Sequence, residues 1–301
     1  MTLAKPYEII RPEFGDLIHA NLRLAQISTG HSRTEGPVWF PAHNTLLFSD
    51  IPNQRMYRWN KEGGPSVFRA ASDFANGNTR DGQGRLVTCQ HGTRSVTRTE
   101  HDGSRTVIAD SFNGKRLNSP NDVVVHSDGS IWFSDPTYGI LSNLEGHKAE
   151  REQPGNFVYR VDPDDLSLTP VADGFTQPNG LAFSRDETRL YIAESGSSHD
   201  ASVPSVLKVF DAAPDGTLSN PRVFAEIDNG LPDGFRVDRY DNVWCSAEDG
   251  VHVFAPTGDL LGKVYVPERV ANLTFGGERG NVLFITATTS VYSLFVNTSG
   301  C

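Results

Sequence analysis

One unit of sequence recurs six times along the chain, and this recurrence constrains the fold more than any other feature. The clearest copy spans residues 118–139 and reads NSPNDVVVHSDGSIWFSDPTYG. It combines a polar turn, a β-branched run, a Ser-Asp-Gly turn and a more apolar run, which together indicate a β-hairpin. The equivalent leading residues of the six units are Glu35, Asn76, Asn121, Asn179, Asp233 and Asn272.

The spacing of these leading residues indicates the architecture. Successive ones are 41, 45, 58, 54 and 39 positions apart, close to the roughly 40–50 residues of a four-stranded propeller blade. Further strand-like runs fill the intervals, such as 54–59 and 66–69, and the two longest units carry insertions at 140–155 and 196–204. The apolar runs are too short, and too often broken by Gly or Pro, for a helical repeat. We therefore predict an all-β fold, a six-bladed β-propeller.

The sixth unit lacks one strand, because the run from Val291 to Val296 would be its third. The run from Leu22 to Ile27 alternates like a strand and precedes the first unit. We expect it to join the last blade, which would close the ring and remove an exposed sheet edge. Residues 1–20 would then be a leader packed outside, and residues 21–301 a single domain, a size that all-β domains reach.

Composition excludes several classes of function. The net charge of −10 argues against binding to nucleic acid or to an anionic membrane. No run of 18 apolar residues and no secretory signal is visible, so we expect a cytoplasmic protein without a membrane span. Cys89, Cys245 and Cys301 lack the spacing of a disulfide framework or a thiolate metal site. We expect a monomer or a weak homodimer.

In a propeller the leading turns of the inner strands meet at the central channel. Two carboxylates and several amide oxygens, without His or Cys, form a hard donor set that suits Ca²⁺ better than Zn²⁺. Asn, Asp and Gly before a strand are also ordinary turn residues. Glu35 is not, and the recurrence at equivalent positions favours a metal site.

Four of these turns carry a resemblance to a known family. The matching segments are Glu35-Gly36-Pro37-Val38-Trp39, Asn121-Asp122 with Trp132 downstream, Pro178-Asn179-Gly180-Leu181-Ala182-Phe183, and Pro232-Asp233-Gly234. Over roughly residues 30–296 the chain resembles the family of gluconolactonase, regucalcin (senescence marker protein) and luciferin-regenerating enzyme. Within that family it is most similar to bacterial gluconolactonases, through Cys89-Gln90-His91-Gly92 and Asp135-Pro136-Thr137-Tyr138-Gly139.

The resemblance implies a six-bladed propeller with one divalent cation in the channel, usually Ca²⁺, although Zn²⁺, Mg²⁺ or Mn²⁺ would also be accepted. The ligands that it implies are Glu35, Asn121, Asn179 and Asp233. The implied reaction is hydrolysis of a sugar lactone, such as glucono-1,5-lactone, to the aldonic acid. The cation would polarise the carbonyl group while water attacks.

The base that activates this water stays open. The family assigns the role to Asp233, but a carboxylate bound to a dication has a lowered pKa and is a weaker base. The alternatives are the cation-bound water, with Asp233 only orienting it, or His91. For substrate contacts we predict Asn76, Asn118, Arg116 and Tyr138, which lie in or beside turns expected at the mouth. Arg116 is not a strict match, because Ser119 occupies the position where regucalcin-like members carry an arginine.

Two other functions fit the same ligand set. One is a related metal-dependent esterase or a phosphotriesterase like diisopropyl fluorophosphatase, since the shape of the pocket would decide the substrate. The other is a noncatalytic calcium-binding propeller. Glu35 argues against the last, because a scaffold has no need of Glu at this turn.

Overall fold

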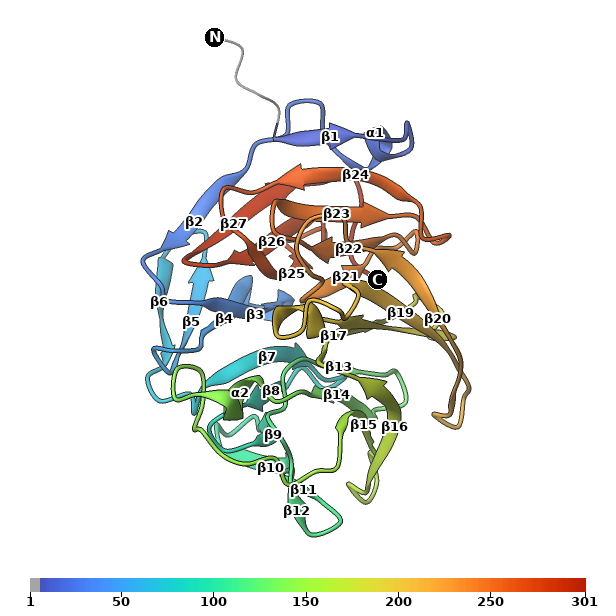
Figure 1. Cartoon of the computed structure of the whole chain (residues 1–301). Coiled ribbons are helices and arrows are strands. Elements are labelled where there is room, and N and C mark those ends of the chain that lie inside the picture. Colours follow the sequence, from blue (N-terminus) through green and yellow to red (C-terminus); the bar gives the residue numbers. More distant parts are fainter. Residues whose placement is uncertain (1–5) are drawn as a thin grey trace.

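The computed structural model describes residues 6–301, which form six antiparallel sheets arranged around a central axis (Figure 1). In each blade the innermost strand is followed outward by the next strands of the sequence. The N-terminal strands β1 (Tyr7–Ile9) and β2 (Ala25–Thr29) are the exceptions, because they join the outer edges of the fifth and sixth blades. This is the six-bladed β-propeller that the repeat predicts.

The first three blades account for the N-terminal half of the ring. The first blade contains β3 (Thr34–Phe40), β4 (Thr45–Asp50), β5 (Arg55–Asn60) and β6 (Gly64–Arg69). The second contains β7 (Ala75–Arg80), β8 (Leu86–Gln90), β9 (Ser95–Thr99) and β10 (Arg105–Ala109). The third contains β13 (Val123–Val125), β14 (Ile131–Asp135), β15 (Asn156–Val161) and β16 (Leu168–Phe175). A two-stranded hairpin that the repeat did not predict, β11 (Ser111–Phe112) with β12 (Lys115–Arg116), connects the second and third blades.

The other three blades complete the ring. The fourth contains β17 (Pro178–Phe183), β18 (Arg189–Glu194), β19 (Val206–Ala212) and β20 (Leu218–Glu226). The fifth contains β21 (Phe235–Val237), β22 (Val243–Ser246), β23 (Gly250–Phe254) and β24 (Leu260–Tyr265). The sixth contains β25 (Val270–Gly276), β26 (Val282–Ala287), β27 (Ser290–Phe295) and β2 (Ala25–Thr29).

The ring closes through β2, which pairs antiparallel with β27 so that Ala25 lies opposite Ser293. The predicted closure by an N-terminal strand is therefore confirmed. The strand begins at Ala25 rather than at Leu22, because Leu22 turns into the hydrophobic core that the leader shares with the fifth and sixth blades.

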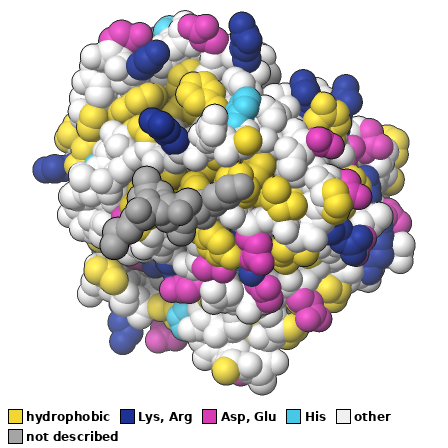
Figure 2. All heavy atoms as spheres, turned by 90° about the horizontal axis from the view of Figure 1, so that it is seen from above, with side chains coloured by type: hydrophobic (Ala, Val, Ile, Leu, Met, Phe, Trp, Pro, Cys, Tyr) yellow, Lys and Arg dark blue, Asp and Glu magenta, His cyan; other side chains and the backbone are white. Residues whose placement is uncertain are grey.

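The described part of the leader is built into the rim. β1 (Tyr7–Ile9) pairs with β24 and extends the fifth blade to five strands. The four-residue helix α1 (Phe14–Leu17) follows, and the buried ring of Phe14 packs against Gly262, where a Cβ atom would lie only 2.2 Å from it. Residues 1–5 of the predicted leader lie outside the described residues. Seen from above the view of Figure 1, the surface mixes hydrophobic, acidic and basic side chains (Figure 2).

Hydrophobic side chains fill the spaces between neighbouring blades. Between the third and fourth, for example, the buried ring of Trp132 meets Phe183 edge to face at 5.3 Å.

The other short α-helix is α2 (Tyr138–Leu141), which begins the first insertion. Within residues 6–301 no helix is long and apolar enough to cross a membrane.

At the axis the blades approach one another through glycine. In four units the residue after the leading residue is Gly, and a Cβ atom there would lie 2.0–2.4 Å from an atom of the next blade's leading residue. These contacts join Gly36 to Asn76, Gly77 to Asn121, Gly180 to Asp233 and Gly234 to Asn272. Because no side chain fits at that distance, glycine is what allows the leading residues to converge.

Substitution of one of these glycines should therefore separate two blades. In Gly180→Ala the added methyl group would lie 2.3 Å from the backbone oxygen of Asp233. We expect the free energy of unfolding to fall by about 2 kcal/mol, measured by denaturant unfolding. The matched control is Gly82→Ala in a turn with no atom within 4 Å, where the change should stay below about 0.5 kcal/mol. Equal losses in the two variants would contradict the close packing at the axis.

Candidate active site

Five of the six leading residues line one cavity of about 250 Å³ at one end of the axis. They are Glu35, Asn76, Asn121, Asn179 and Asp233. We call this space the axial cavity. Asn272, the sixth leading residue, is not part of the lining and donates instead to Oδ2 of Asp122 at 3.3 Å.

A buried carboxylate holds the backbone just ahead of the leading residue in three blades. It is the last residue of the second strand. It accepts hydrogen bonds from two consecutive backbone N–H groups at 2.8–3.2 Å. Asp50 accepts from Ser32 and Arg33, Asp135 from Asn118 and Ser119, and Glu194 from Thr176 and Gln177. The donors lie three and two residues before Glu35, Asn121 and Asn179. We call these three side chains the clamp carboxylates.

Sequence reasoning missed the clamp carboxylates, although each ends a matching strand in the sequence as Ser-Asp, Ser-Asp or Ala-Glu. Their hydrogen bonds satisfy backbone donors that would otherwise be buried without partners. Each clamp thereby fixes the path by which the chain enters its inner strand.

Irregular pairing at the start of the inner strands turns the leading side chains toward the cavity. The register between inner and second strand shifts between Glu35 and Val38, between Ala75 and Asn78, and between Pro178 and Leu181. Such bulges re-aim side chains at the mouths of sheets. The side chains of Glu35, Asn76 and Asn179 therefore lie in the cavity rather than between blades.

The two carboxylates of the cavity are buried together. Burial raises the pKa of Glu35 well above its ordinary value, and the nearby Asp233 raises it further. Burial also raises the pKa of Asp233, to about 6, although Arg33 opposes the shift. Two buried like charges are costly unless a cation compensates them.

The amides beside them are free to bind a ligand. Asn121 and Asn179 are 6% and 4% exposed, and their side chains make no hydrogen bond within residues 6–301. Buried amides without partners, next to two carboxylates, form an oxygen-donor set that fits Ca²⁺. Across the described chain no group of three His, Cys, Asp or Glu side chains could hold a metal. A cation in this cavity would thus depend on the amide oxygens of Asn121 and Asn179.

Arg33 was not predicted from the sequence, yet it faces this cavity. Its Nη1 lies 3.1 Å from Glu145 of the first insertion, and its Nη2 lies 3.9 Å from Oδ2 of Asp233. Burial opposes its charge, but Glu145 and Asp233 leave the pKa of Arg33 above its ordinary value. The positively charged guanidinium group of Arg33 is therefore a fixed part of the cavity. Arg269 is a second arginine in the lining.

His91 lies behind Asn76 rather than in the lining. Its Nδ1 is 2.9 Å from the backbone oxygen of Glu145, which can only accept, so Nδ1 carries the proton. Its Nε2 is then an acceptor for the Asn76 amide nitrogen at 3.2 Å. Burial lowers the pKa of His91, which keeps the ring neutral. Because Nδ2 of Asn76 is committed to His91, the Asn76 oxygen Oδ1 is left for a ligand.

The structure separates the other predicted substrate contacts. Tyr138 lines the cavity, and its hydroxyl group donates to the backbone oxygen of Ser195 at 3.2 Å. Asn118 is fully buried, and its amide group donates to the backbone oxygen of Gly155 at 3.0 Å. Arg116 is exposed and donates to the backbone oxygen of Thr93 at 2.8 Å. Neither Asn118 nor Arg116 is part of the lining.

The fold and the cavity define a class of protein: a six-bladed propeller with an oxygen-lined site at one end of its axis. Residues 33–289 match the family model described as SMP-30/Gluconolactonase/LRE-like region. The chain belongs to this family.

Individual relatives agree with the match. The chain is 32% identical to the gluconolactonase of Zymomonas mobilis over 96% of its own length and 85% of that protein. It superposes with a TM-score of 0.90 on the gluconolactonase of Xanthomonas campestris, at 38% identity, over 97% of this chain and 95% of the other. Regucalcin of Agrobacterium tumefaciens, a calcium-binding protein, shares the fold at 17% identity, with a TM-score of 0.75 over 93% of this chain and 96% of the other.

Removal of one clamp should loosen the site. In Glu194→Gln, one acceptor oxygen is replaced by an NH₂ group that faces backbone N–H donors. We expect a loss of about 2–3 kcal/mol in the free energy of unfolding. We also expect weaker cation binding, because Asn179 lies two residues after the clamped backbone of Thr176 and Gln177. Denaturant unfolding and calcium titration measure the two effects. The matched control, Glu226→Gln on the exposed side of β20, should change neither. Unchanged stability in Glu194→Gln would contradict the clamp.

Proposed function

We propose that the protein hydrolyses a sugar lactone, glucono-1,5-lactone or a similar aldonolactone, to the aldonic acid, with a divalent cation held by Glu35, Asn121, Asn179 and Asp233. The observation that carries this proposal is the convergence of these four side chains on one cavity. Lactone hydrolysis is supported by two gluconolactonases that match nearly the whole chain at 32% and 38% identity.

The cation that we propose is Ca²⁺. Its preference for carboxylate and amide oxygens suits this donor set, and the relative regucalcin is named as a calcium-binding protein. Zn²⁺, Mg²⁺ or Mn²⁺ are alternatives, because an open oxygen site selects weakly among divalent ions. When bound, the cation would polarise the lactone carbonyl and stabilise the negative charge that develops on its oxygen.

The polar lining suits a polyol better than an apolar ester. The Asn76 Oδ1 atom can accept from a sugar hydroxyl group, since its Nδ2 is held by His91. Arg33 can donate to a hydroxyl group or to the carboxylate of the product. Tyr138 forms part of the wall beside them. These contacts would hold the lactone ring with its carbonyl group toward the four proposed ligands.

Asp233 is the group that we assign to accept the proton of the attacking water. A cation lowers the pKa of a carboxylate that it binds. Burial acts in the opposite direction and raises the pKa of Asp233 to about 6 in the protein alone. Burial therefore leaves a cation-bound Asp233 a stronger base than an exposed carboxylate would be in the same role. His91 is less suited, because both of its ring nitrogens are engaged behind Asn76.

The reaction is tested by hydrolysis of glucono-1,5-lactone, followed in a pH-stat against the spontaneous rate. We expect a rate well above background that disappears with chelator and returns when Ca²⁺, Mn²⁺, Mg²⁺ or Zn²⁺ is added. Glu35→Gln should remove both this recovery and the rise in melting temperature that a bound cation gives; that rise corresponds to about 2.7 kcal/mol at 100 times Kd.

Other outcomes identify the competing functions. Activity on diisopropyl fluorophosphate or phenyl acetate, without activity on lactones, would indicate the phosphotriesterase or esterase. Cation-dependent melting without hydrolysis of any of these compounds would indicate the noncatalytic calcium-binding propeller. A lactonase rate that chelator does not affect would contradict the role of the cation.

The base is tested with Asp233→Asn and His91→Gln, both assayed at saturating cation. We expect kcat to fall by about 100-fold or more in Asp233→Asn, the usual effect of losing a general base. In His91→Gln, KM should rise more than kcat falls, because the amide group of Asn76 is released. A Asp233→Asn enzyme that keeps most of its kcat would exclude Asp233 as the base. A larger fall of kcat in His91→Gln would return that role to His91.

A further inference from the structure

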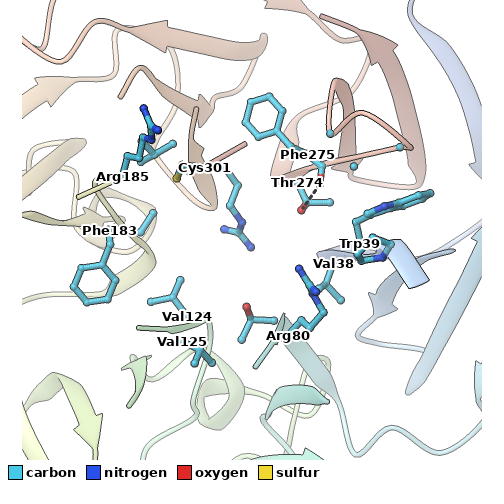
Figure 3. Close-up of a pocket in the computed structure, with 18 of the residues that line it drawn as sticks. Val38, Trp39, Arg80, Val124, Val125, Phe183, Arg185, Thr274, Phe275 and Cys301 are labelled. Atoms are coloured by element: carbon cyan, nitrogen blue, oxygen red, sulfur yellow. Dashed lines mark hydrogen bonds between the residues drawn. The ribbon is translucent and has the colours of Figure 1, made fainter. Parts of the chain in front are cut away.

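A second cavity, of about 530 Å³, lies at the opposite end of the axis (Figure 3). Five leading residues, at or just before the starts of their inner strands, line the axial cavity, whereas later residues of all six inner strands contribute to this one. We call it the far cavity. Among its lining residues are Val38, Arg80, Val124, Phe183, Arg236 and Phe275, one from each blade.

Positive charge gathers in the far cavity of an otherwise acidic chain. Three guanidinium groups line it, those of Arg80, Arg185 and Arg236, although the chain carries a net charge of −10. Arg185 is the least central, since its side chain points away from the middle of the cavity (Figure 3). Such a cluster attracts an anion.

Two carboxylates, those of Glu187 and Glu278, also line the far cavity, but among the described residues neither lies within ion-pair distance of the three arginines. Arg236 lies 3.7 Å from Oδ2 of Asp122, the one carboxylate within ion-pair distance of the three arginines among the described residues. Glu187 is engaged elsewhere, by the backbone N–H of Ser127 at 2.9 Å and by His126 at 3.2 Å. Arg80 is exposed, and its guanidinium group makes no hydrogen bond or ion pair within residues 6–301.

Apolar and aromatic side chains form the rest of the wall. Trp39, Val124, Phe183 and Phe275 line the cavity with Arg80. In Figure 3 the rings of Trp39 and Phe183 lie at its edge rather than toward its middle. The indole ring of Trp39 is held in place by stacking on Phe284, with the ring centroids 5.1 Å apart. An apolar wall beside a few charged or polar groups is the usual make-up of a small-molecule pocket, and 530 Å³ is in the usual size range.

We propose that the far cavity binds a small organic anion, with its carboxylate or phosphate group on Arg80 and Arg236 and an aromatic or aliphatic body against Trp39 and Phe275. Arginine is suited to this role because its planar group can donate two parallel hydrogen bonds to such an anion. The recess at the centre of six blades favours a small molecule over a macromolecular surface. This site is separate from the proposed lactonase site and is inferred independently of the proposed function.

Phenyl phosphate is the probe, titrated by calorimetry into the chelator-treated protein. We expect saturable binding with Kd below about 1 mM, and binding of inorganic phosphate or phenol at least ten-fold weaker. Arg80→Gln should weaken the binding of phenyl phosphate about ten-fold. Arg236→Lys keeps a positive charge near Asp122 but loses the planar guanidinium group, so it should also weaken the binding of phenyl phosphate. The matched control Arg55→Gln, an exposed arginine of β5, should bind phenyl phosphate like the unaltered protein.

Cys301 reports the location, because it lines the far cavity while Cys89 and Cys245 are buried. Phenyl phosphate should slow the alkylation of Cys301 by the neutral reagent iodoacetamide several-fold, and this protection should be lost in Arg80→Gln. The proposal is overturned by an absence of saturation at 10 mM, by equal affinity for inorganic phosphate, or by unchanged affinity in Arg80→Gln. Loss of binding in Arg33→Gln but not in Arg80→Gln would assign the anion to the axial cavity and overturn it too.

Discussion

The geometry of the axial cavity depends on the carboxylates that clamp the backbone ahead of three leading residues. A leading side chain on a mobile turn would lose conformational entropy whenever it bound a ligand, which would weaken the binding. The clamps remove that cost in advance, since two charge-assisted hydrogen bonds fix the chain directly before Glu35, Asn121 and Asn179. Where a site must gather oxygen atoms from different blades, this preorganisation sets how tightly a cation can be held.

The clamps act together with close contact between blades. Glycine after the leading residue brings the backbone of one blade against the next, as Gly180 does against Asp233. The clamp fixes a leading residue along its own chain, and the glycine contact fixes it relative to its neighbour. Burial of Glu35 and Asp233 follows from this convergence, and so do their raised pKa values. The electrostatic character of the site is thus a consequence of how closely the blades pack.

The sequence predicts the fold well, because a repeated hairpin with turn residues at fixed places is a local signal. The same repeat identifies the leading residues, five of which share a cavity. The repeat does not identify residues of the site that lie outside its equivalent positions. Arg33 and Arg269 have the sequence context of ordinary surface arginines, and only the closed ring places both at the axial cavity. His91 lies behind Asn76, where its Nδ1 donates to the backbone oxygen of Glu145 from the first insertion. Asn118 was predicted at the cavity because it is close to Asn121 in sequence, but the clamp holds its backbone and its side chain is buried in the third blade.

Charge connects the two ends of the axis. Burial is the main cause of the raised pKa values of Glu35 and Asp233, and Asp122 makes a smaller contribution to both, so it lies within electrostatic reach of the axial cavity. The same carboxylate lies 3.7 Å from Arg236, which lines the far cavity. An anion on Arg236 would compete with Asp122 for the guanidinium group and leave the buried carboxylate less compensated. A cation in the axial cavity relieves the same excess of negative charge, so binding at either end should favour binding at the other. The acidic and basic ends of this axis are therefore parts of one charge arrangement, with Asp122 and Arg236 as the link.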